Sequence, residues 1–426
     1  MENIKNILIR NAKIVDCNSE YNGQKRDILI IDGIIKKISK NINFDQPFLE
    51  IKKNNLHLSP GWLDMHCNIC EPGLEHRENI QSGLNSAAKG GFTSIVTTPN
   101  TYPPVDSKSS ILFLIKKSIN NIVDIHPVGC ITKKLYGEEI TEMYDMYKHG
   151  AVAFSDGKKQ IKNAMLMNTA LDYVKNFNGL IMTTCIDADL NEKSQINEGE
   201  VSTITGLRPS PAIAEEIAVL RDIALLKYTK SRLHISTISC EASINHINKA
   251  KKNNLNLTSD IAAHQIILND NDLIEFNTLN KVMPPLRSKK TQSALIKAIK
   301  DGVINAISSD HNPVEEELKV VEFDQAEFGM IGIETVFPII NTVLKDHINI
   351  NKITELISIN PRTILNIVTP VIEINTKANI TLFDPFKEWT YKKEHIQSLS
   401  KNTPFINYKF TGKVVGIINK GKVSLN

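Results

Sequence analysis

The chain has 426 residues, of which 41% are hydrophobic and 23% are charged, ordinary values for a globular protein. This length is more than one small core needs, and it suits a large α/β domain of ~250–300 residues with a smaller module. The 50 basic and 47 acidic residues leave a net charge of +3, which argues against a protein that binds nucleic acid or membrane surfaces.

No apolar run reaches the ~18 residues that a membrane span needs. Residues 1–16 have the pattern of a strand rather than of a signal peptide. The six cysteines have no regular spacing, which fits reduced thiols in the cytosol. We therefore expect a cytoplasmic protein.

Both ends of the chain are rich in short strand patterns. Near the N-terminus, residues 27–31 and 34–38 flank Asp32-Gly33, a typical hairpin turn. The C-terminal segment has similar short strand patterns at residues 378–383 and 412–418. We predict one small β-sandwich module assembled from residues 1–57 and 370–426.

The middle of the chain repeats a helix followed by a strand. Residues 78–89 predict a helix that ends at Gly90-Gly91, and residues 92–98 follow as a buried strand. The later helix–strand pairs are 141–149 with 151–154, 164–176 with 180–183, 212–228 with 233–236, 243–252 with 255–258, and 291–300 with 303–308. This alternation predicts a parallel sheet, and its length favours a (β/α)8 TIM barrel over residues 58–369.

Chemistry in such a barrel takes place where the strands end. The stretch LDMHCNICEPG, residues 63–73, places His66, Asn68 and Cys70 at alternate positions of one strand. Alternate residues share a face of a strand, so we expect these three side chains to point into the barrel mouth. No glycine-rich phosphate-binding motif follows any strand, so a nucleotide cradle at a strand end is not supported.

Ten stretches in chain order resemble the dihydroorotases of the cyclic amidohydrolase superfamily, with their allantoinase and hydantoinase relatives. They are 59–66 (SPGWLDMH), 71–78 (EPGLEHRE), 90–94 (GGFTS), 98–101 (TPNT), 150–156 (GAVAFSD), 284–287 (PPLR), 309–313 (SDHNP), 328–335 (FGMIGIET), 360–362 (NPR) and 401–405 (KNTPF). The resemblance implies a metallo-dependent hydrolase barrel with a small β-sandwich from both ends, and a role in pyrimidine biosynthesis.

The resembling family uses one or two zinc ions that polarise a ring amide and activate a bound water. Its ligands are a His-x-His pair, an aspartate or modified lysine, two further histidines and a catalytic aspartate. Matched to these positions, His66 and Asp310 are retained, Asp310 also as general base and acid, and Asn100 remains as a substrate-binding residue. The ligand positions lost are Asn68, Gly157, Thr184 and Thr237.

Other family positions also differ. Cys70 stands where the family carries an arginine that binds the substrate carboxylate, and a thiol has no fork of donors for that purpose. Met283 and Val314 replace an asparagine and a histidine. Asp156 lies next to Gly157 and remains a possible substitute ligand. We expect His234, His264 and His311 to be core or supporting histidines.

Two hypotheses follow. The favoured one is a non-catalytic dihydroorotase homologue that binds no cofactor tightly and, like metal-depleted bacterial members of the resembling family, acts as a structural partner of aspartate transcarbamoylase, with homo-oligomers expected. The alternative is an active zinc-dependent dihydroorotase or other cyclic amidohydrolase with an unusual metal site. A site rebuilt from Cys70, Cys185 or Cys240 with His66 is a less favoured form of that alternative.

Overall fold

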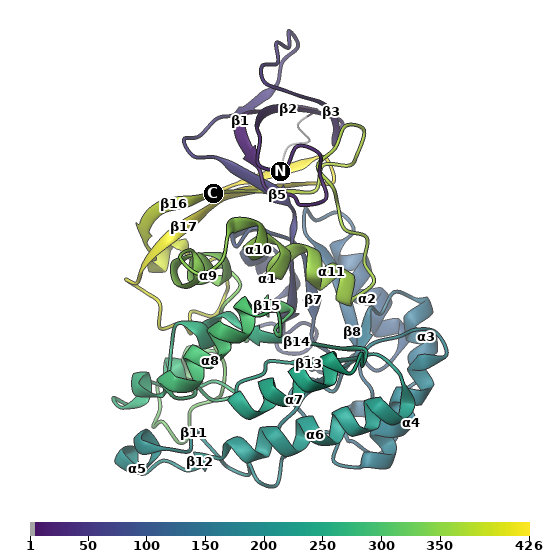
Figure 1. Cartoon of the computed structure of the whole chain (residues 1–426), viewed down its shortest axis with the longest axis vertical. Coiled ribbons are helices and arrows are strands. Elements are labelled where there is room, and N and C mark those ends of the chain that lie inside the picture. The colour runs from purple at the N-terminus through teal and green to yellow at the C-terminus, as the bar shows by residue number, and fades with distance from the viewer. Residues whose placement is uncertain (1–4) are drawn as a thin grey trace.

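A computed structural model describes residues 5–426 and places all but two of the strands in two large sheets (Figure 1). The first is a parallel sheet of eight strands in chain order, and it forms the barrel. Its strands are β6 (Trp62–Cys67), β7 (Phe92–Thr97), β8 (Asp124–Gly129), β9 (Ala153–Phe154), β10 (Ile181–Thr184), β13 (Leu233–Ser236), β14 (Leu257–Ala262) and β15 (Ala306–Ser308).

Helices follow the barrel strands and cover the outside of the sheet (Figure 1). They are α1 (Ile80–Lys89), α2 (Lys108–Ser118), α3 (Met143–Lys148), α4 (Ala164–Lys175), α5 (Glu200–Thr205), α6 (Ala212–Thr229), α7 (Glu241–Lys252), α8 (Lys289–Lys300), α9 (Val336–Leu344), α10 (Ile350–Thr354) and α11 (Asn360–Ile364). The short pair β11 (Ile196–Asn197) and β12 (Pro209–Ser210) flanks α5.

The barrel closes where β15 returns to β6. Cys67 and His311 form a parallel bridge just beyond β15. The backbone N–H of Asn68 donates to the carbonyl of His311 at 2.9 Å, and the N–H of His311 donates to the carbonyl of His66 at 3.1 Å. The parallel (β/α)8 prediction is confirmed.

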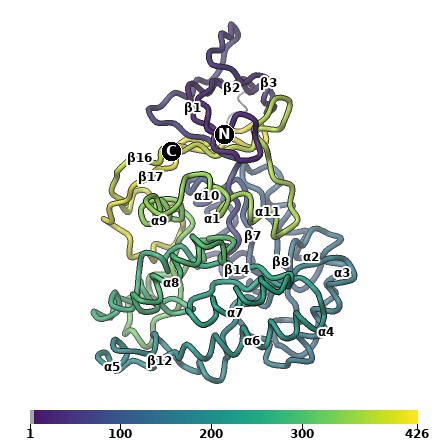
Figure 2. The backbone as a smooth tube through the Cα atoms, viewed as in Figure 1, coloured from purple at the N-terminus to yellow at the C-terminus, as the bar shows by residue number. Residues whose placement is uncertain are grey.

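The second sheet is mixed and is built from both ends of the chain, so the two termini lie in the same upper module (Figure 2). Its strands are β1 (Asn6–Ile14), β2 (Lys25–Ile31), β3 (Ile34–Ser39), β4 (Leu49–Ile51), β5 (His57–Pro60), β16 (Ile380–Thr390), β17 (Lys409–Asn419) and β18 (Lys422–Leu425). The hairpin at Asp32-Gly33 joins β2 to β3 as predicted. β5 crosses the predicted boundary at residue 57, and the domain division itself stays a prediction.

A buried aromatic cluster joins the terminal sheet to the barrel. The Trp62 ring lies 4.9 Å from Phe337 and 5.5 Å from Phe383, measured between ring centroids. Its indole N–H donates to Ser59 Oγ at 2.9 Å. Gly91 has φ +91°, and a Cβ there would lie 2.7 Å from the Trp62 ring. Glycine at the end of α1 therefore permits both the turn and the packing of Trp62.

Element boundaries differ from the sequence prediction for local reasons. The helix α1 begins at Ile80 rather than at residue 78, because Asn79 caps it by accepting a hydrogen bond from the Ser82 backbone at 2.9 Å. Glu78 is then free to turn inward, where it is fully buried. The unit α2–β8 was not among the predicted pairs, although residues 111–115 of α2 are all apolar.

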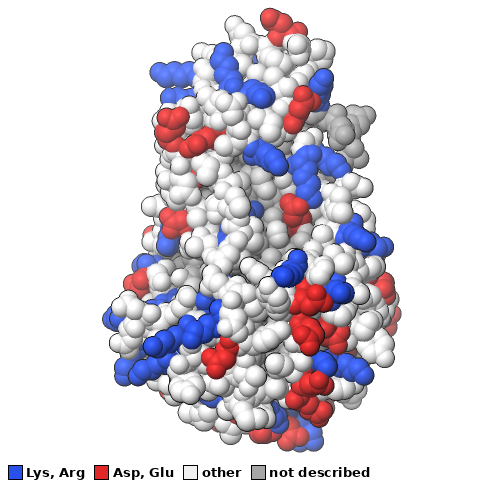
Figure 3. All heavy atoms as spheres, turned by 90° about the vertical axis from the view of Figure 1, so that its right-hand side faces the viewer, with Lys and Arg blue, Asp and Glu red and all other residues white. Residues whose placement is uncertain are grey.

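Charged residues of both signs occur on the face shown in Figure 3, in small basic and acidic groups, in agreement with the small net charge. All six cysteines are free thiols, and only Cys17 is exposed. Within residues 5–426, none of the helices combines the length and the apolar character that a bilayer crossing requires.

We expect Trp62→Ala to lower the free energy of unfolding by about 3–5 kcal/mol, because it leaves a cavity where three aromatic rings meet. Urea unfolding followed by circular dichroism measures the change. Tyr228→Ala is the control, since that side chain is 78% exposed, and it should shift stability by no more than ~0.5 kcal/mol. Equal effects of the two substitutions would contradict the role given to Trp62.

Candidate functional site

A cavity of about 200 Å³ opens at the carboxyl ends of the barrel strands. Its walls come from β6, the segments after β7 and β9, the end of β10, and the segment after β15. The lining residues are His66, Asn68, Thr98, Asn100, Leu135, Asp156, Gly157, Lys158, Lys159, Thr184, Asp310, His311 and Asn312. The structure therefore brings together His66, Asn100 and Asp310, the residues singled out from the sequence.

The carboxylate of Asp64 fixes the two ends of this site relative to each other. Asp64 is buried, and it accepts hydrogen bonds from the Ser309 backbone N–H at 2.7 Å and from Ser309 Oγ at 2.6 Å. Burial raises the pKa of Asp64 to about 7, against the opposing effect of these hydrogen bonds. His66 lies two residues after Asp64, and Asp310 lies one residue after Ser309. The hydrogen bonds between Asp64 and Ser309 therefore hold His66 and Asp310 on adjacent walls of the cavity.

His66 belongs to a buried chain of polar groups in the barrel. Its Nε2 lies 3.5 Å from Asp260 Oδ2, and His234 Nε2 lies 3.1 Å from the same oxygen. Burial lowers the pKa of His66, although Asp260 and Asp310 act in the other direction. Burial opposes ionisation of Asp260 too, but His66 and His234 hold the pKa of this carboxyl below its usual value. Asp260 is therefore the ionised partner of two imidazoles.

Asn68 and Cys70 lie beyond the last residue of β6, so strand alternation does not apply to them. Asn68 faces the cavity, and its amide donates to Asn312 Oδ1 at 3.0 Å while its Oδ1 accepts from the Cys70 backbone at 3.0 Å. The prediction for Cys70 was wrong. Its backbone turns into the left-handed region at φ +58°, and its buried thiol is not part of the cavity wall.

Asp156 uses both carboxylate oxygens to hold a neighbouring segment. Oδ1 accepts from the backbone N–H groups of Ile131 and Thr132, each at 2.9 Å, and Oδ2 accepts from the Thr132 hydroxyl. Burial raises the pKa of this carboxyl. Asp156 thus lines the cavity but serves the loop after β8, while Gly157 beside it supplies no donor side chain.

Lys158 places a positive charge next to the retained aspartate. Its Nζ donates to Asp310 Oδ2 at 2.8 Å and to the carbonyl oxygen of Met283 at 2.7 Å. Asp310 is nearly buried at 6% exposure, with φ +47° two residues after the end of β15. Met283, predicted as a lost substrate-binding position, therefore contributes its backbone carbonyl to hold the ammonium group.

The remaining family positions carry small or apolar side chains. Thr184 lines the cavity, whereas Thr237 is buried and its hydroxyl has no hydrogen-bond partner among residues 5–426. The Thr237 backbone N–H donates to Asp260 Oδ1 at 2.6 Å. Val314 is buried, and its N–H donates to Asn402 Oδ1 at 3.2 Å. Of the residues described, 5–426, no three His, Cys, Asp or Glu side chains converge as a metal site would require.

The other histidines and cysteines have supporting positions. His264 is buried, and burial lowers its pKa to about 4. His311 lines the cavity with its Nε2 3.5 Å from Glu78 Oε2. Cys185 and Cys240 are buried outside the cavity wall, with Cys185 Sγ 3.2 Å from Asp222 Oδ2. A site rebuilt from these thiols with His66 receives no support from this geometry.

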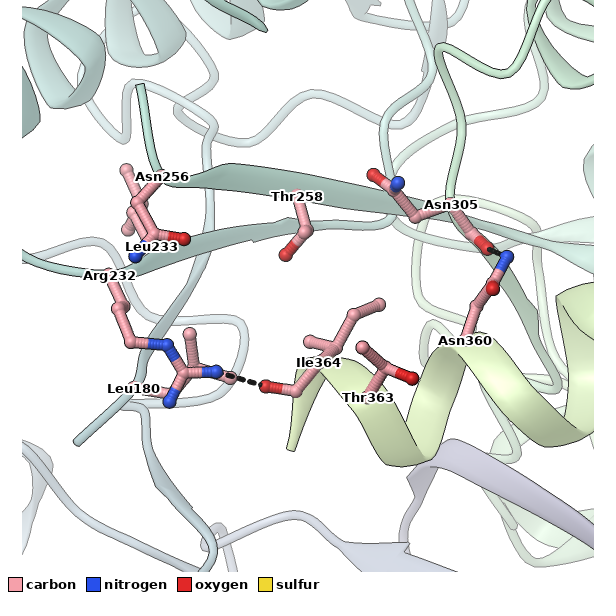
Figure 4. A pocket seen from close by; sticks show the side chains of 9 residues that line it. All are labelled: Leu180, Arg232, Leu233, Asn256, Thr258, Asn305, Asn360, Thr363 and Ile364. Carbon is pink, nitrogen blue, oxygen red and sulfur yellow. Dashed lines mark hydrogen bonds between the residues drawn. The ribbon is translucent and has the colours of Figure 1, made fainter. Parts of the chain in front are cut away.

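A second cavity of about 200 Å³ lies at the opposite end of the barrel strands (Figure 4). Arg232 donates there to the carbonyl of Ile364 at 2.6 Å, and Asn360 donates to the carbonyl of Asn305 at 2.8 Å. Arg232 is the one charged residue in its lining, and it has no carboxylate partner there. Groups at this end of a barrel serve stability rather than chemistry.

Two residues of the site were missed in the sequence. Lys158 follows a loop glycine and gave no motif signal, although a lysine two residues after a strand-end aspartate could have drawn notice. Asp260 lies in β14, and its contacts with His66 and His234 depend on three separate strands. Their register is not visible in the sequence.

The comparisons with known proteins agree with one another. The family described as "Dihydro-orotase-like" matches residues 56–243. A protein named "Dihydroorotase" from Caldicellulosiruptor saccharolyticus is 43% identical over 423 residues, covering 98% of both chains. One of the same name from Acetivibrio thermocellus is 39% identical over 420 residues, again covering 98% of both.

Among solved structures, an L-hydantoinase from Arthrobacter aurescens superposes with a TM-score of 0.85 at 21% identity, covering 99% of this chain and 96% of that one. This likeness establishes the fold. Identities of 39% and 43% over nearly the full length establish more: the chain belongs to the dihydroorotase family of cyclic amidohydrolases.

Proposed function

We propose that this protein is a dihydroorotase homologue of pyrimidine biosynthesis that lacks the zinc-dependent reaction and acts as a structural partner of aspartate transcarbamoylase. The observation that carries the proposal is the ion pair between Lys158 Nζ and Asp310 Oδ2, 2.8 Å apart. An ammonium group stands against the carboxylate that a metal ion would need, and two like charges cannot share that place.

The donor set around this ion pair supports the same reading. A catalytic zinc ordinarily has three protein ligands and an open position. His66 and Asp310 are the retained ligand positions, and the side chains at 68, 157, 184 and 237 are an amide, a hydrogen and two hydroxyls. Asp156 is already engaged by Ile131 and Thr132. These residues do not suit a catalytic zinc, so the family reaction has no activated water.

The family motifs that remain serve the fold, which supports a structural role. Glu334 accepts from the backbone N–H groups of Gln397 at 2.8 Å and Ser398 at 3.1 Å. Glu78 accepts from the Ser398 hydroxyl and from the Leu399 backbone. Both buried carboxylates hold the segment after β16 against the barrel. These buried contacts serve the fold and need no metal ion, which supports a structural role for the chain.

A second candidate is an active dihydroorotase with an unusual site. The relatives that are 43% and 39% identical carry the name "Dihydroorotase", and His66 and Asp310 both line the cavity. This candidate requires Lys158 to move away from Asp310 before a cation can bind.

We expect the protein, purified without chelators, to contain far less than one zinc per chain and to show no cyclisation of carbamoyl-aspartate. Metal content is measured by elemental analysis, and turnover by the formation of dihydroorotate. A full equivalent of zinc, together with turnover that Asp310→Ala abolishes, would establish the second candidate instead.

We expect Lys158→Ala to lower the free energy of unfolding by about 1–3 kcal/mol, because Asp310 would keep a nearly buried carboxylate without its charged donor. Lys159→Ala is the matched control, since Lys159 lines the same cavity and has no ion pair in residues 5–426. It should change stability by no more than ~0.5 kcal/mol. A Lys158→Ala variant as stable as the control would show that the ion pair with Asp310 does not stabilise the protein.

The partner is tested separately. Co-expressed with aspartate transcarbamoylase from the same organism, the protein should elute as a joint complex in size-exclusion chromatography with light scattering. Lys158→Ala should still form it, because the barrel cavity is not a docking surface. Separate elution of the two proteins at micromolar concentration would refute the structural role, whatever the metal content.

A further inference from the structure

The terminal sheet contains a hollow that the proposed function does not use. β1 pairs in parallel with β4 through residues 7–9 and with β5 through Lys13 and Ile14. The chain between β4 and β5 leaves the sheet over residues 52–56, and β1 bulges at Asn11, where φ is +46°. The gap between the two pairings opens a hollow of about 600 Å³. This size is in the range of small-molecule sites.

The hollow is lined by basic side chains from three separate segments, and we name it the lysine hollow. The side chains that define it are Arg10, Lys13, Lys25, Lys52 and Lys53, with Phe386 at the rim. Arg10 is neutralised by Asp27 at 2.8 Å and Glu50 at 2.9 Å. Within residues 5–426, no carboxylate lies within 4.0 Å of the ammonium groups of the four lysines.

Three acidic residues near the lysine hollow already have partners, and their charges offset only part of the charge of Arg10 and the four lysines. Asp27 and Glu50 bind Arg10, and Asp384 Oδ1 accepts from the Phe386 backbone at 2.9 Å. His57, in the same wall, is buried. Burial lowers the pKa of His57, against a hydrogen bond with the Asn55 backbone and the charge of Asp384, and the charges of Lys13 and Lys25 lower it further. Four lysines facing one concave space repel each other, and an anion there would relieve that repulsion.

An aromatic ring stands at the rim of this charged space. Phe386 is 65% exposed, and its ring meets His57 edge-on at a centroid distance of 5.8 Å. An exposed phenyl face beside several ammonium groups offers a stacking surface next to anion-binding groups. A nucleobase with its phosphates presents the complementary pair of features.

We propose that the lysine hollow binds a nucleotide, with the phosphates held by Lys13, Lys25, Lys52 and Lys53 and the base stacked on Phe386. The site lies in the terminal sheet, apart from the barrel mouth, and it does not depend on whether the protein is catalytic. Its ligand is a mononucleotide, because the concave space lies within one module and the small net charge of the chain does not favour a nucleic acid.

Isothermal titration of the full chain with ATP, AMP and inorganic tripolyphosphate tests the proposal. We expect ATP to bind more tightly than AMP, and added salt to weaken both. The Lys52→Ala/Lys53→Ala variant should bind ATP at least tenfold more weakly. Phe386→Ala should weaken ATP binding while leaving tripolyphosphate binding unchanged, because only the base uses the ring.

Two controls separate this site from other lysines. Lys289→Ala/Lys290→Ala removes an exposed pair at the start of α8, and Lys159→Ala removes a lysine of the barrel mouth. Both should bind ATP like the unaltered protein, and thermal melts confirm that every variant is folded. Absence of ATP binding, or equal binding by all variants, would overturn the proposal. If tripolyphosphate binds as tightly as ATP and Phe386→Ala has no effect on ATP binding, the lysine hollow binds simple polyanions and the nucleotide proposal is wrong.

Discussion

The whole candidate site depends on one buried carboxylate at the seam of the barrel. A parallel barrel has to join its last strand to its first, and here Asp64 in β6 receives both the backbone N–H and the hydroxyl of Ser309 after β15. A carboxylate without water around it is costly, and these two donors compensate for that burial. Because they define one orientation, residues from distant parts of the chain reach the same cavity with His66 on one wall and Asp310 on another.

A cavity held in this way has to balance its own charges. Asp310 brings a negative charge into a nearly buried place, and a counter-charge must come either from a bound cation or from the chain. Lys158 supplies it from the loop after β9, and the carbonyl of Met283 satisfies a further ammonium hydrogen. Asn68 is likewise occupied, with its amide bridging Asn312 and the Cys70 backbone. In the proposed reading, the chain has replaced a cation site by a self-contained polar network.

The sequence was informative where local pattern decides structure. Alternation of helix and strand predicted the barrel, Asp32-Gly33 predicted its hairpin, and the strand-end motifs predicted His66 and Asp310. Pattern failed where a strand stops. Alternation placed Cys70 in the mouth, but β6 ends at Cys67 and the backbone then turns. It also could not reveal Lys158, whose long side chain reaches Asp310 from another loop, or Asp260, whose partners come from neighbouring strands.

The residues that identify the family and those that would carry its reaction are largely different residues. Glu78 and Glu334 hold the segment 397–399, and Arg362 donates to the carbonyl of Gly61 at 2.6 Å just before β6. Glu78, Glu334 and Arg362 are all buried. Replacing any one of them lowers the free energy of unfolding considerably, because buried polar groups would lose their charged partner. Such positions preserve resemblance over the full chain even when the pocket changes, since the fold needs them whether or not a metal binds. Whether the family reaction can take place therefore depends more on a few donor atoms at the strand ends, and on the ammonium group of Lys158, than on overall sequence identity.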